Sequence, residues 1–170
     1  MKTKIDINLF IVCTYAEYLS DLKSVQERRW NNFPLSHLVD KPGHKKGTVA
    51  FRHKTERIGG VIQLRENDAC FEGLFNCSGI KGAGSVLQMI RIGYACALGR
   101  VPRLYCWESL VPLYTKRGWA TVKVHPFDPA LAPDGWQGGE QACHEMIYPN
   151  ASKACRESVA FRYGAGLALK

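Results

Sequence analysis

The sequence predicts a single α/β (α+β) domain in which helices flank a mixed, mostly antiparallel sheet. The chain has 170 residues, 46% of them hydrophobic, which is enough for one domain with its own buried core. Segments with the alternation of strands are interspersed with segments that have the period of helices. Near the middle, an apolar strand-like segment (69–76) passes through a glycine-rich turn into an apolar helix-like segment (85–98), and another short strand follows. This succession predicts a β-α-β unit within the sheet.

The N-terminal quarter of the chain predicts one strand, one helix and a long loop. Apolar residues alternate with other residues between positions 5 and 11, as in a half-buried strand. Thr14 and Glu17 have the spacing of a capping box, so a helix is expected over residues 15–29. Residues 30–47 contain prolines and glycines and predict a loop. Such a loop, together with 127–141, is expected to shape the acceptor pocket of an enzyme.

The remaining segments predict the rest of the sheet. Two β-rich segments, 48–53 and 57–64, are separated by a short polar turn and predict an antiparallel hairpin. The central unit ends with a strand over 102–107, which should run parallel to 69–76. The pattern then predicts, in order, a short helix (109–116), a strand (119–124), an irregular segment (127–139), a strand (143–148) and a terminal helix (151–163).

The turn between the central strand and helix has the composition of an anion-binding site. Gly79, Gly82 and Gly84 let the backbone approach a ligand without intervening Cβ atoms, and Lys81 adds a cation. Unpaired N–H groups at a helix N-terminus attract phosphate groups. A Walker A loop is excluded because no Lys-Ser or Lys-Thr pair follows, and the dinucleotide fingerprint is excluded because its third glycine is missing. A tight turn that binds no ligand is the alternative interpretation.

Composition narrows the classes of protein and partner. No apolar run is long enough for a transmembrane helix, and no signal-peptide core is evident, so we expect a cytoplasmic protein with no membrane partner. The seven cysteines are scattered without a Cys-x-x-Cys pair, which argues against a metal site and favours buried, reduced thiols. The net charge is +8, and basic residues gather in the basic loop 41–54. A basic surface suits either nucleic acid or an anionic cofactor.

Two segments taken together resemble a known superfamily. The first is the Gly-x-x-Gly-x-Gly pattern that ends at Gly84, between strand and helix, and the second is Leu-Tyr-Thr-Lys-Arg-Gly-Trp over 113–119. Both segments, and the order of elements around them, are similar to those of the GNAT N-acetyltransferase superfamily. The resemblance covers residues 48–148 of one domain spanning 1–170, and 149–170 form an extension without a counterpart. It implies that the two central parallel strands splay apart.

The resemblance also implies a cofactor and a way of binding it. The cofactor would be acetyl-CoA or a related acyl-CoA, with its pyrophosphate on backbone amides of the turn and its pantetheine arm along the bulged central strand. A backbone N–H near Leu74 or Phe75 would stabilise the oxyanion. Gly79 stands where the superfamily usually has Arg or Gln, and Lys81 would supply the missing cation. The residues assigned in this way are Leu74, Phe75, Asn76, Gly79, Lys81, Gly82, Ala83, Gly84 and Ser85.

Three residues are candidates for proton transfer. Tyr114 matches the superfamily tyrosine that protonates the departing thiolate; the alternative is a tyrosine that only packs a helix against the sheet. Glu72, on the central strand, is the first candidate for the base that deprotonates the acceptor amine, and Glu108 is the second. Glu72 could instead face solvent or pair with a lysine, and Glu108 could cap the helix that follows it. The single histidines His37, His53 and His144 are interpreted as structural.

Three functions follow from these patterns. The first is an acyltransferase that moves an acetyl or other acyl group from acyl-CoA to an amine by direct attack in a ternary complex. The second is an acyl-CoA-dependent toxin or modifier whose acceptor is an amine on charged tRNA or a DNA base. The third is a non-catalytic binding module that has kept the fold. The sequence leaves open both the acceptor and the choice between monomer and homodimer.

Overall fold

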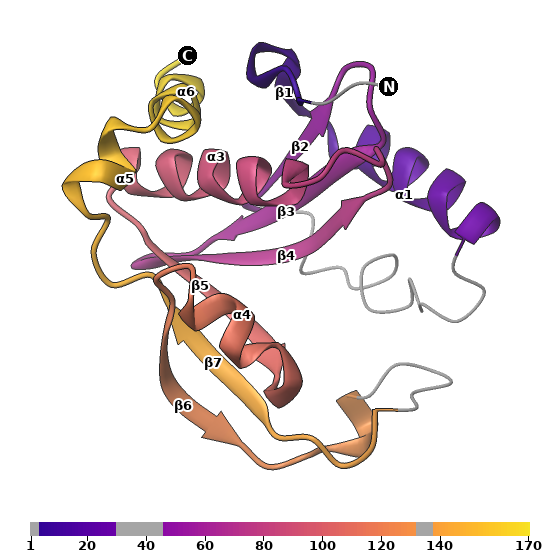
Figure 1. The fold of residues 1–170 in the computed structure, drawn as a ribbon, viewed down its shortest axis with the longest axis vertical. Helices are drawn as coiled ribbons and strands as arrows, with labels where there is room; N and C mark the ends of the chain where they lie inside the picture. The colour runs from indigo at the N-terminus through magenta and orange to yellow at the C-terminus, as the bar shows by residue number, and fades with distance from the viewer. Residues whose placement is uncertain (1–3, 30–45, 132–137) are drawn as a thin grey trace.

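The computed structural model describes residues 4–29, 46–131 and 138–170, and its fold is of the predicted α/β class (Figure 1). In this part of the chain, seven strands form one mixed sheet in the order β1-β2-β3-β4-β5-β7-β6. Neighbouring strands are antiparallel except for β4 and β5, which form the predicted parallel pair. The strands are β1 (Phe10–Cys13), β2 (Thr48–His53), β3 (Ile58–Leu64), β4 (Asp68–Asn76), β5 (Val101–Trp107), β6 (Ala120–His125) and β7 (Cys143–Ile147).

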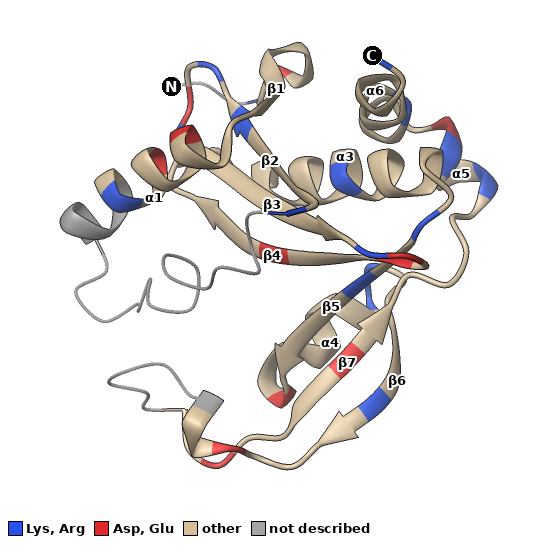
Figure 2. Ribbon diagram, turned by 180° about the vertical axis from the view of Figure 1, so that it is seen from behind, with Lys and Arg blue, Asp and Glu red and all other residues tan. Residues whose placement is uncertain are grey.

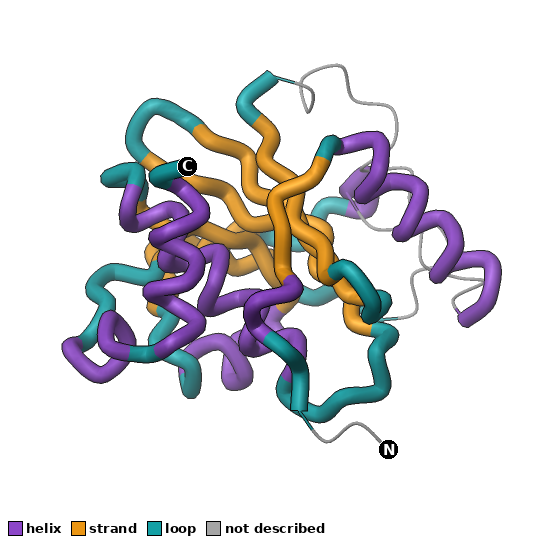
Figure 3. The backbone as a smooth tube through the Cα atoms, turned by 90° about the horizontal axis from the view of Figure 1, so that it is seen from above, coloured by secondary structure: helices purple, strands orange, loops and turns teal. Residues whose placement is uncertain are grey.

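Helices cover both faces of the sheet (Figures 1 and 3). α1 (Tyr15–Arg29) packs on β2 and β3, and α3 (Ala83–Ala97) packs on β3, β4 and β5 from the opposite face. α6 (Val159–Ala168) lies against the outer side of α3. The remaining short elements are α4 (Val111–Thr115), α5 (Lys153–Glu157) and the 3₁₀ turns η1 (Ile7–Leu9), η3 (Glu108–Leu110) and η4 (Pro129–Leu131).

Each face of the sheet has its own hydrophobic cluster. Successive side chains of a strand point to opposite faces, so that on β2 Ala50 belongs to one cluster and Phe51 to the other. The larger cluster lies between α3 and the sheet and includes Phe71, Leu87, Ile90, Trp119 and Met146. The smaller lies under α1 and consists of Tyr18, Leu22, Ala50, Val61 and Phe75.

The start of the chain differs from the prediction, whereas the first helix agrees with it. The strand expected over 5–11 is wrong in its first half, because the side chain of Asp6 accepts a hydrogen bond from the N–H of Asn8 at 3.0 Å and starts a 3₁₀ turn. The strand begins only at Phe10. The capping box is confirmed, since the N–H of Thr14 donates to Glu17 Oε2 at 2.8 Å and the N–H of Glu17 donates to Thr14 Oγ1 at 3.2 Å.

The C-terminal residues form two helices where one was expected. The backbone is extended at Ser158 (φ −63°, ψ 142°), which separates α5 from α6 and corrects the single helix predicted over 151–163. The Ser158 side chain accepts from the N–H of Phe161 at 3.3 Å, so the same residue caps the second helix. The C-terminal extension 149–170, for which the resemblance gave no counterpart, thus ends in a helix that packs on α3.

Several other expectations concern properties of the whole chain. In the segments that the structure describes, no helix has the length and apolar character needed to cross a membrane. All seven cysteines have free thiols; three of them are buried and four are half-buried, so the predicted burial is confirmed for three. The loop predicted over 30–47 lies outside the described residues up to position 45, and residues 132–137 of the loop 127–141 lie outside them as well.

Candidate active site

The parallel strands β4 and β5 separate halfway along their length. Their register runs from Asp68 opposite Val101 to Phe71 opposite Leu104 and stops there, although β4 continues to Asn76 and β5 to Trp107. Figure 1 shows β5 and β7 turning away from β4 at this point. Within the described residues, the backbone of the second half of β4 therefore has no strand beside it on the β5 side. The splayed pair expected from the sequence resemblance is confirmed.

A β-bulge in β4 accompanies this separation. Opposite β3, the register shifts between the pairs Gly59–Phe75 and Val61–Glu72, so β4 contains one more residue than β3 in this interval. The extra residue lies at Gly73, whose φ of 55° is left-handed. The hydroxyl of Tyr18, on α1, donates to the carbonyl oxygen of Gly73 at 2.7 Å and holds the bulge from that face.

The glycine-rich turn leads from the end of β4 to an uncapped helix. Gly82 is the N-cap of α3, has a φ of 82° and provides no side-chain hydrogen bond to the helix. Of the five amides from Lys81 to Ser85, two donate to protein carbonyls, that of Ala83 to Ile80 at 3.3 Å and that of Ser85 to Gly82 at 3.0 Å. The amides of Lys81, Gly82 and Gly84 have no protein acceptor within the described residues. These three N–H groups can therefore bind an anion.

Space for a ligand lies beside these amides. A Cβ atom built on Gly79 or Gly82 would meet nothing within 4 Å, and the side chain of Lys81 is exposed. A Cβ atom on Gly84 would lie 3.8 Å from side-chain atoms of both Leu74 and Asn76. The start of α3 therefore packs on the side chains at the end of β4, and the open space lies beside Gly79 and Gly82.

The three assigned residues of β4 do not all face this space. Leu74 and Asn76 are exposed and lie toward Gly84, whereas the side chain of Phe75 is buried on the opposite face, with its ring centroid 5.8 Å from that of Tyr18. Only the backbone of Phe75 could therefore contact a ligand at the turn. The side chain of Asn76 accepts hydrogen bonds from the N–H and hydroxyl of Ser78, which fixes the start of the turn.

Tyr114 lies on α4, on the same face of the sheet as α3. Its ring is 6.2 Å from that of buried Trp119, in an edge-on arrangement, and Trp119 in turn meets the ring of Phe71 at 5.6 Å. Burial raises the pKa of the Tyr114 hydroxyl, and the positive charge of Arg91 partly opposes that increase. Tyr114 is thus a neutral hydroxyl group at physiological pH, as a proton donor must be.

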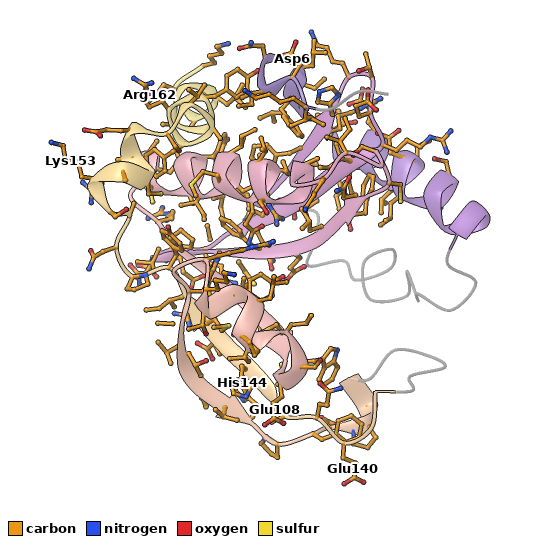
Figure 4. All side chains as sticks on the ribbon, in the orientation of Figure 1. Asp6, Glu108, Glu140, His144, Lys153 and Arg162 are labelled. Carbon is orange, nitrogen blue, oxygen red and sulfur yellow. The ribbon has the colours of Figure 1, made fainter. Side chains whose placement is uncertain are left out.

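Glu72 and Glu108 occupy different surroundings. Glu72 is half-buried and lies on the α1 face of β4. The pKa of Tyr15, at the start of α1, is raised mainly by burial and to a lesser extent by the negative charge of Glu72. Because Phe71 and Glu72 point to opposite faces, Glu72 lies across the sheet from Tyr114. Glu108 is exposed in the half of the molecule formed by β5, β6 and β7 (Figure 4). It does not cap the following turn: Glu108 is the first residue of η3, whose N-cap is Trp107, and no side chain caps η3 or α4.

The histidines and the basic segment are accounted for by local structure where it is described. His53 is buried, with Nε2 2.9 Å from the carbonyl oxygen of Asp6 and Nδ1 accepting from the N–H of Glu56 at 3.0 Å. His144 lies 3.3 Å from the Thr121 hydroxyl. Within 41–54, positions 41–45 lie outside the described residues, 48–53 form β2, and Arg52 pairs with Asp21 at 3.1 Å. Figure 2 shows lysines and arginines spread over many elements of the described chain.

One residue in this region was not singled out by the sequence patterns. Arg91 is completely buried on α3, and its guanidinium group donates to the carbonyl oxygens of Val61 and Glu72, the residues that flank the bulge. The available signal was the presence of Arg91 and Gln88, three residues apart, in an otherwise apolar helix. Helical periodicity places such a pair on one side of the helix but does not reveal what it contacts.

Comparison with known proteins identifies the fold. Neither a protein-family model nor a curated protein matches the sequence. Among solved structures, an N-acetyltransferase from Staphylococcus aureus Mu50 is similar with a TM-score of 0.57 and 12% identity, over 82% of this chain and 95% of that one. The chain has the GNAT fold.

Two further structures with the GNAT fold have comparable similarity. An acyl-CoA N-acyltransferase from Pseudomonas aeruginosa has a TM-score of 0.55 and 12% identity, over 84% of this chain and 99% of that one. The ribosomal-protein-S18-alanine N-acetyltransferase from Escherichia coli has a TM-score of 0.54 and 10% identity, over 85% and 96%. The chain therefore spans nearly the full length of these structures, and at such low identity the likeness concerns the fold.

Proposed function

We propose that this protein is an acyl-CoA-dependent N-acyltransferase that moves an acetyl or related acyl group to an amine. The observation that carries the proposal is the junction of the free edge of β4 with the uncapped N-terminus of α3, where three amides have no protein acceptor within the described residues. A pyrophosphate and an extended amide-containing arm require these two features side by side. The reduced thiols suit the cytoplasm as the compartment in which this activity takes place.

The turn would bind the anionic part of the acyl-CoA. The N–H groups of Lys81, Gly82 and Gly84 would donate to pyrophosphate oxygens, and the Lys81 ammonium group would lie beside them. Gly79 removes a steric obstacle but contributes no charge, and Ala83 and Ser85 define the first helical turn. Backbone groups of Leu74 and Asn76 would pair with the pantetheine arm in place of the strand that β5 does not provide.

The residues around the strand opening would handle the protons. Glu72 would accept a proton from the acceptor amine as its nitrogen bonds to the acyl carbon, with Glu108 as the alternative base. A backbone N–H at Leu74 or Phe75 would stabilise the negative charge on the carbonyl oxygen. When the C–S bond breaks, Tyr114 would give its hydroxyl proton to the sulfur. The acyl-CoA supplies an activated thioester, and the protein supplies position, a dry environment and proton transfer.

A glycine substitution at the junction tests the proposal. Gly84→Leu would press its side chain against Leu74 and Asn76 at the junction of α3 and β4, without backbone strain because Gly84 is not left-handed. We expect loss of acetyl-CoA binding in isothermal titration calorimetry. Gly166→Leu is the matched control, since a Cβ atom there meets nothing within 4 Å and the residue lies on α6. The wild type and the control should bind acetyl-CoA equally.

Turnover should then be measured as release of coenzyme A in the presence of different amines. A polyamine, a peptide with a free N-terminal alanine and a charged tRNA represent the acceptor classes that remain open. No binding of acetyl-CoA or longer acyl-CoAs by the wild type would overturn the proposal. Binding without release of coenzyme A for any acceptor would instead identify a binding module that has kept the GNAT fold.

A further inference from the structure

Arg91 connects three elements beneath the proposed thioester site. It projects from α3 to the sheet and is only 2% exposed. Its Nη1 donates to the carbonyl oxygens of Val61 on β3 (2.8 Å) and Glu72 on β4 (2.9 Å), and its Nη2 donates to Gln88 Oε1 on α3. The guanidinium carbon also lies 4.9 Å from the centre of the Phe71 ring. Arg91 therefore ties the helix to both strands at the bulge.

The local sequence makes room for this arginine. Val61 and Glu72 are paired at the point where β3 and β4 change register, so both accepting carbonyls flank the bulge. A Cβ atom on Gly60 would lie 2.8 Å from Arg91 Nη1, and only glycine leaves that space for the guanidinium group. The bulge and the buried arginine consequently depend on each other.

The charge of Arg91 is not neutralised by a carboxylate. Among the described residues, no Asp or Glu side chain lies within ion-pair distance of the guanidinium group, and its Nε is buried with no hydrogen-bond partner. Burial lowers the pKa of Arg91 to about 10, so it is still a cation at neutral pH. An unpaired buried charge is costly to stability, so its presence needs a reason other than packing.

Negative charge would develop near this cation during acyl transfer. Of the ionisable groups around Arg91, Tyr114 is the one whose ionised form would favour the Arg91 cation most. Contacts run from Arg91 to Tyr114 through the rings of Phe71 and Trp119, which meet edge-on. After Tyr114 has given its proton to the sulfur, the phenolate that remains is stabilised by a nearby positive charge in a medium of low dielectric constant. The carbonyl of Glu72, held by Arg91, directly precedes the part of β4 that binds the acyl group in the proposed function.

We infer that Arg91 is a positioning residue for acyl transfer, which holds the bulge of β4 in shape and supplies positive potential to Tyr114. The inference rests on the proposed function, because it assigns a role within the same site. Arg91 acts through Tyr114 and the β4 backbone and does not itself contact the substrate. Gln88, which accepts from Nη2 without adding a negative charge, keeps the cation oriented and unneutralised.

Gln88→Glu separates the electrostatic role from a structural one. The substitution keeps the size of the side chain and its hydrogen bond to Arg91, but it introduces a carboxylate that neutralises the cation. We expect the folded state to be at least as stable, acetyl-CoA affinity to be nearly unchanged, and turnover to fall about 10-fold. The pH at which activity declines on the alkaline side should rise, because Tyr114 loses the positive charge that favours its ionisation.

Substitutions of Arg91 itself complete the test. Arg91→Met removes both the positive charge and the hydrogen bonds to the carbonyl oxygens of β3 and β4. It should therefore lower turnover by about 100-fold with a small change in acetyl-CoA affinity. Arg91→Lys should restore part of that loss, because it keeps the charge. Arg100→Met, just beyond α3, removes the same charge outside the site and should leave turnover unchanged.

The outcomes distinguish this inference from the proposed function. If the wild type binds acetyl-CoA and transfers the acyl group, but Gln88→Glu and Arg91→Met leave turnover and its alkaline limb unchanged, the role of Arg91 is overturned and the proposed function stands. The same holds if turnover falls only in proportion to the folded fraction measured by circular dichroism. If the wild type binds no acyl-CoA, both fail together.

Discussion

At the scale of single residues, Tyr114 combines the features of a proton donor. It is half-buried beside Trp119, and burial raises its pKa above the ordinary value of 10.0. A raised pKa means that the hydroxyl keeps its proton at neutral and mildly alkaline pH. A general acid in this position would therefore be protonated at neutral pH, where part of the acceptor amine is already in its neutral form.

Replacement of Tyr114 by Phe should consequently affect turnover and not binding. We expect release of coenzyme A to slow by about 100-fold or more, because only a transition-state interaction is removed, while the dissociation constant of acetyl-CoA measured by calorimetry stays within about twofold. Tyr94→Phe on α3 is the control, since Tyr94 packs against Phe51 away from the strand opening. Equal turnover of the two variants would assign Tyr114 a packing role only.

The candidate residues differ in how far the sequence could identify them. Tyr114 and the glycines lie within short motifs, so local spacing is sufficient to select them. Arg91 could not be selected in this way, because its role depends on which backbone carbonyls lie next to the bulge of β4. The register between two strands cannot be predicted from the sequence of either strand alone. Glu72 was correctly placed on the central strand, but its position on the face opposite Tyr114 became evident only from packing.

At the scale of elements, the contact between α3 and α6 depends on two glycines. A Cβ atom on Gly93 would lie 2.1 Å from the carbonyl oxygen of Phe161, and one on Gly164 would lie 1.9 Å from that of Ile90. The two helices therefore meet backbone to backbone. A side chain at either position forces the helices apart, and α6 can move only by giving up its buried contacts with α3.

Alanine substitutions measure the strength of this contact. Gly93→Ala and Gly164→Ala should each lower the free energy of unfolding by about 1–3 kcal/mol, as overpacked core positions do. Gly166→Ala, two residues from Gly164 and with nothing near its Cβ, should be neutral or stabilising by up to about 1 kcal/mol. Chemical denaturation followed by circular dichroism gives these values. A stability gain in all three variants would show that the helices are not in close contact.

Local patterns predicted most elements, and their failures have local causes. The sequence predicts the hairpin of β2 and β3, the central β-α-β unit and the helix after Thr14, because the residue patterns that indicate them are short and local. The expected strand over 5–11 failed because the Asp6 side chain competes for a backbone N–H, which apolar alternation does not register. The terminal helix was divided because Ser158 can cap a helix as readily as continue one.

At the scale of the whole molecule, the candidate site lies where the sheet divides into two parts. β1 to β4 form one part with α1 and α3, and β5, β7 and β6 form the other with α4 (Figure 1). Within the described sheet, the strands of the two parts pair over only four residue pairs, from Asp68–Val101 to Phe71–Leu104, and the larger hydrophobic cluster under α3 spans both parts. Each part is held by its own antiparallel ladder, so the opening between them costs few hydrogen bonds. The resemblance to the GNAT superfamily anticipated this opening, which no single segment of sequence could specify.

Buried and half-buried thiols should lower the stability of the whole molecule at alkaline pH. Burial raises the pKa of Cys13 and Cys70 to about 12 and that of Cys106 to about 11, from an ordinary value of 9.0. The folded state then holds these protons more tightly than the unfolded chain does. Their stabilising contribution is complete below pH 9 and is lost as the pH rises from 9 through 11 to 12. Arg91, whose pKa is lowered to about 10, has the opposite effect above pH 10, but it is one group against three.

The denaturation midpoint in urea, measured under reducing conditions, should therefore be nearly constant from pH 7 to 9 and should fall between pH 9 and 11. Cys106→Val replaces a buried thiol by a side chain that cannot ionise, so the fall should become shallower in that variant because one of the three protons no longer contributes. Comparing how steeply the midpoint falls with pH in the wild type and in Cys106→Val cancels the effects of pH on the unfolded chain, because both proteins share them. A midpoint that stays constant up to pH 11 in the wild type would mean that the thiols are accessible to solvent and that the core around β4 and β5 is open.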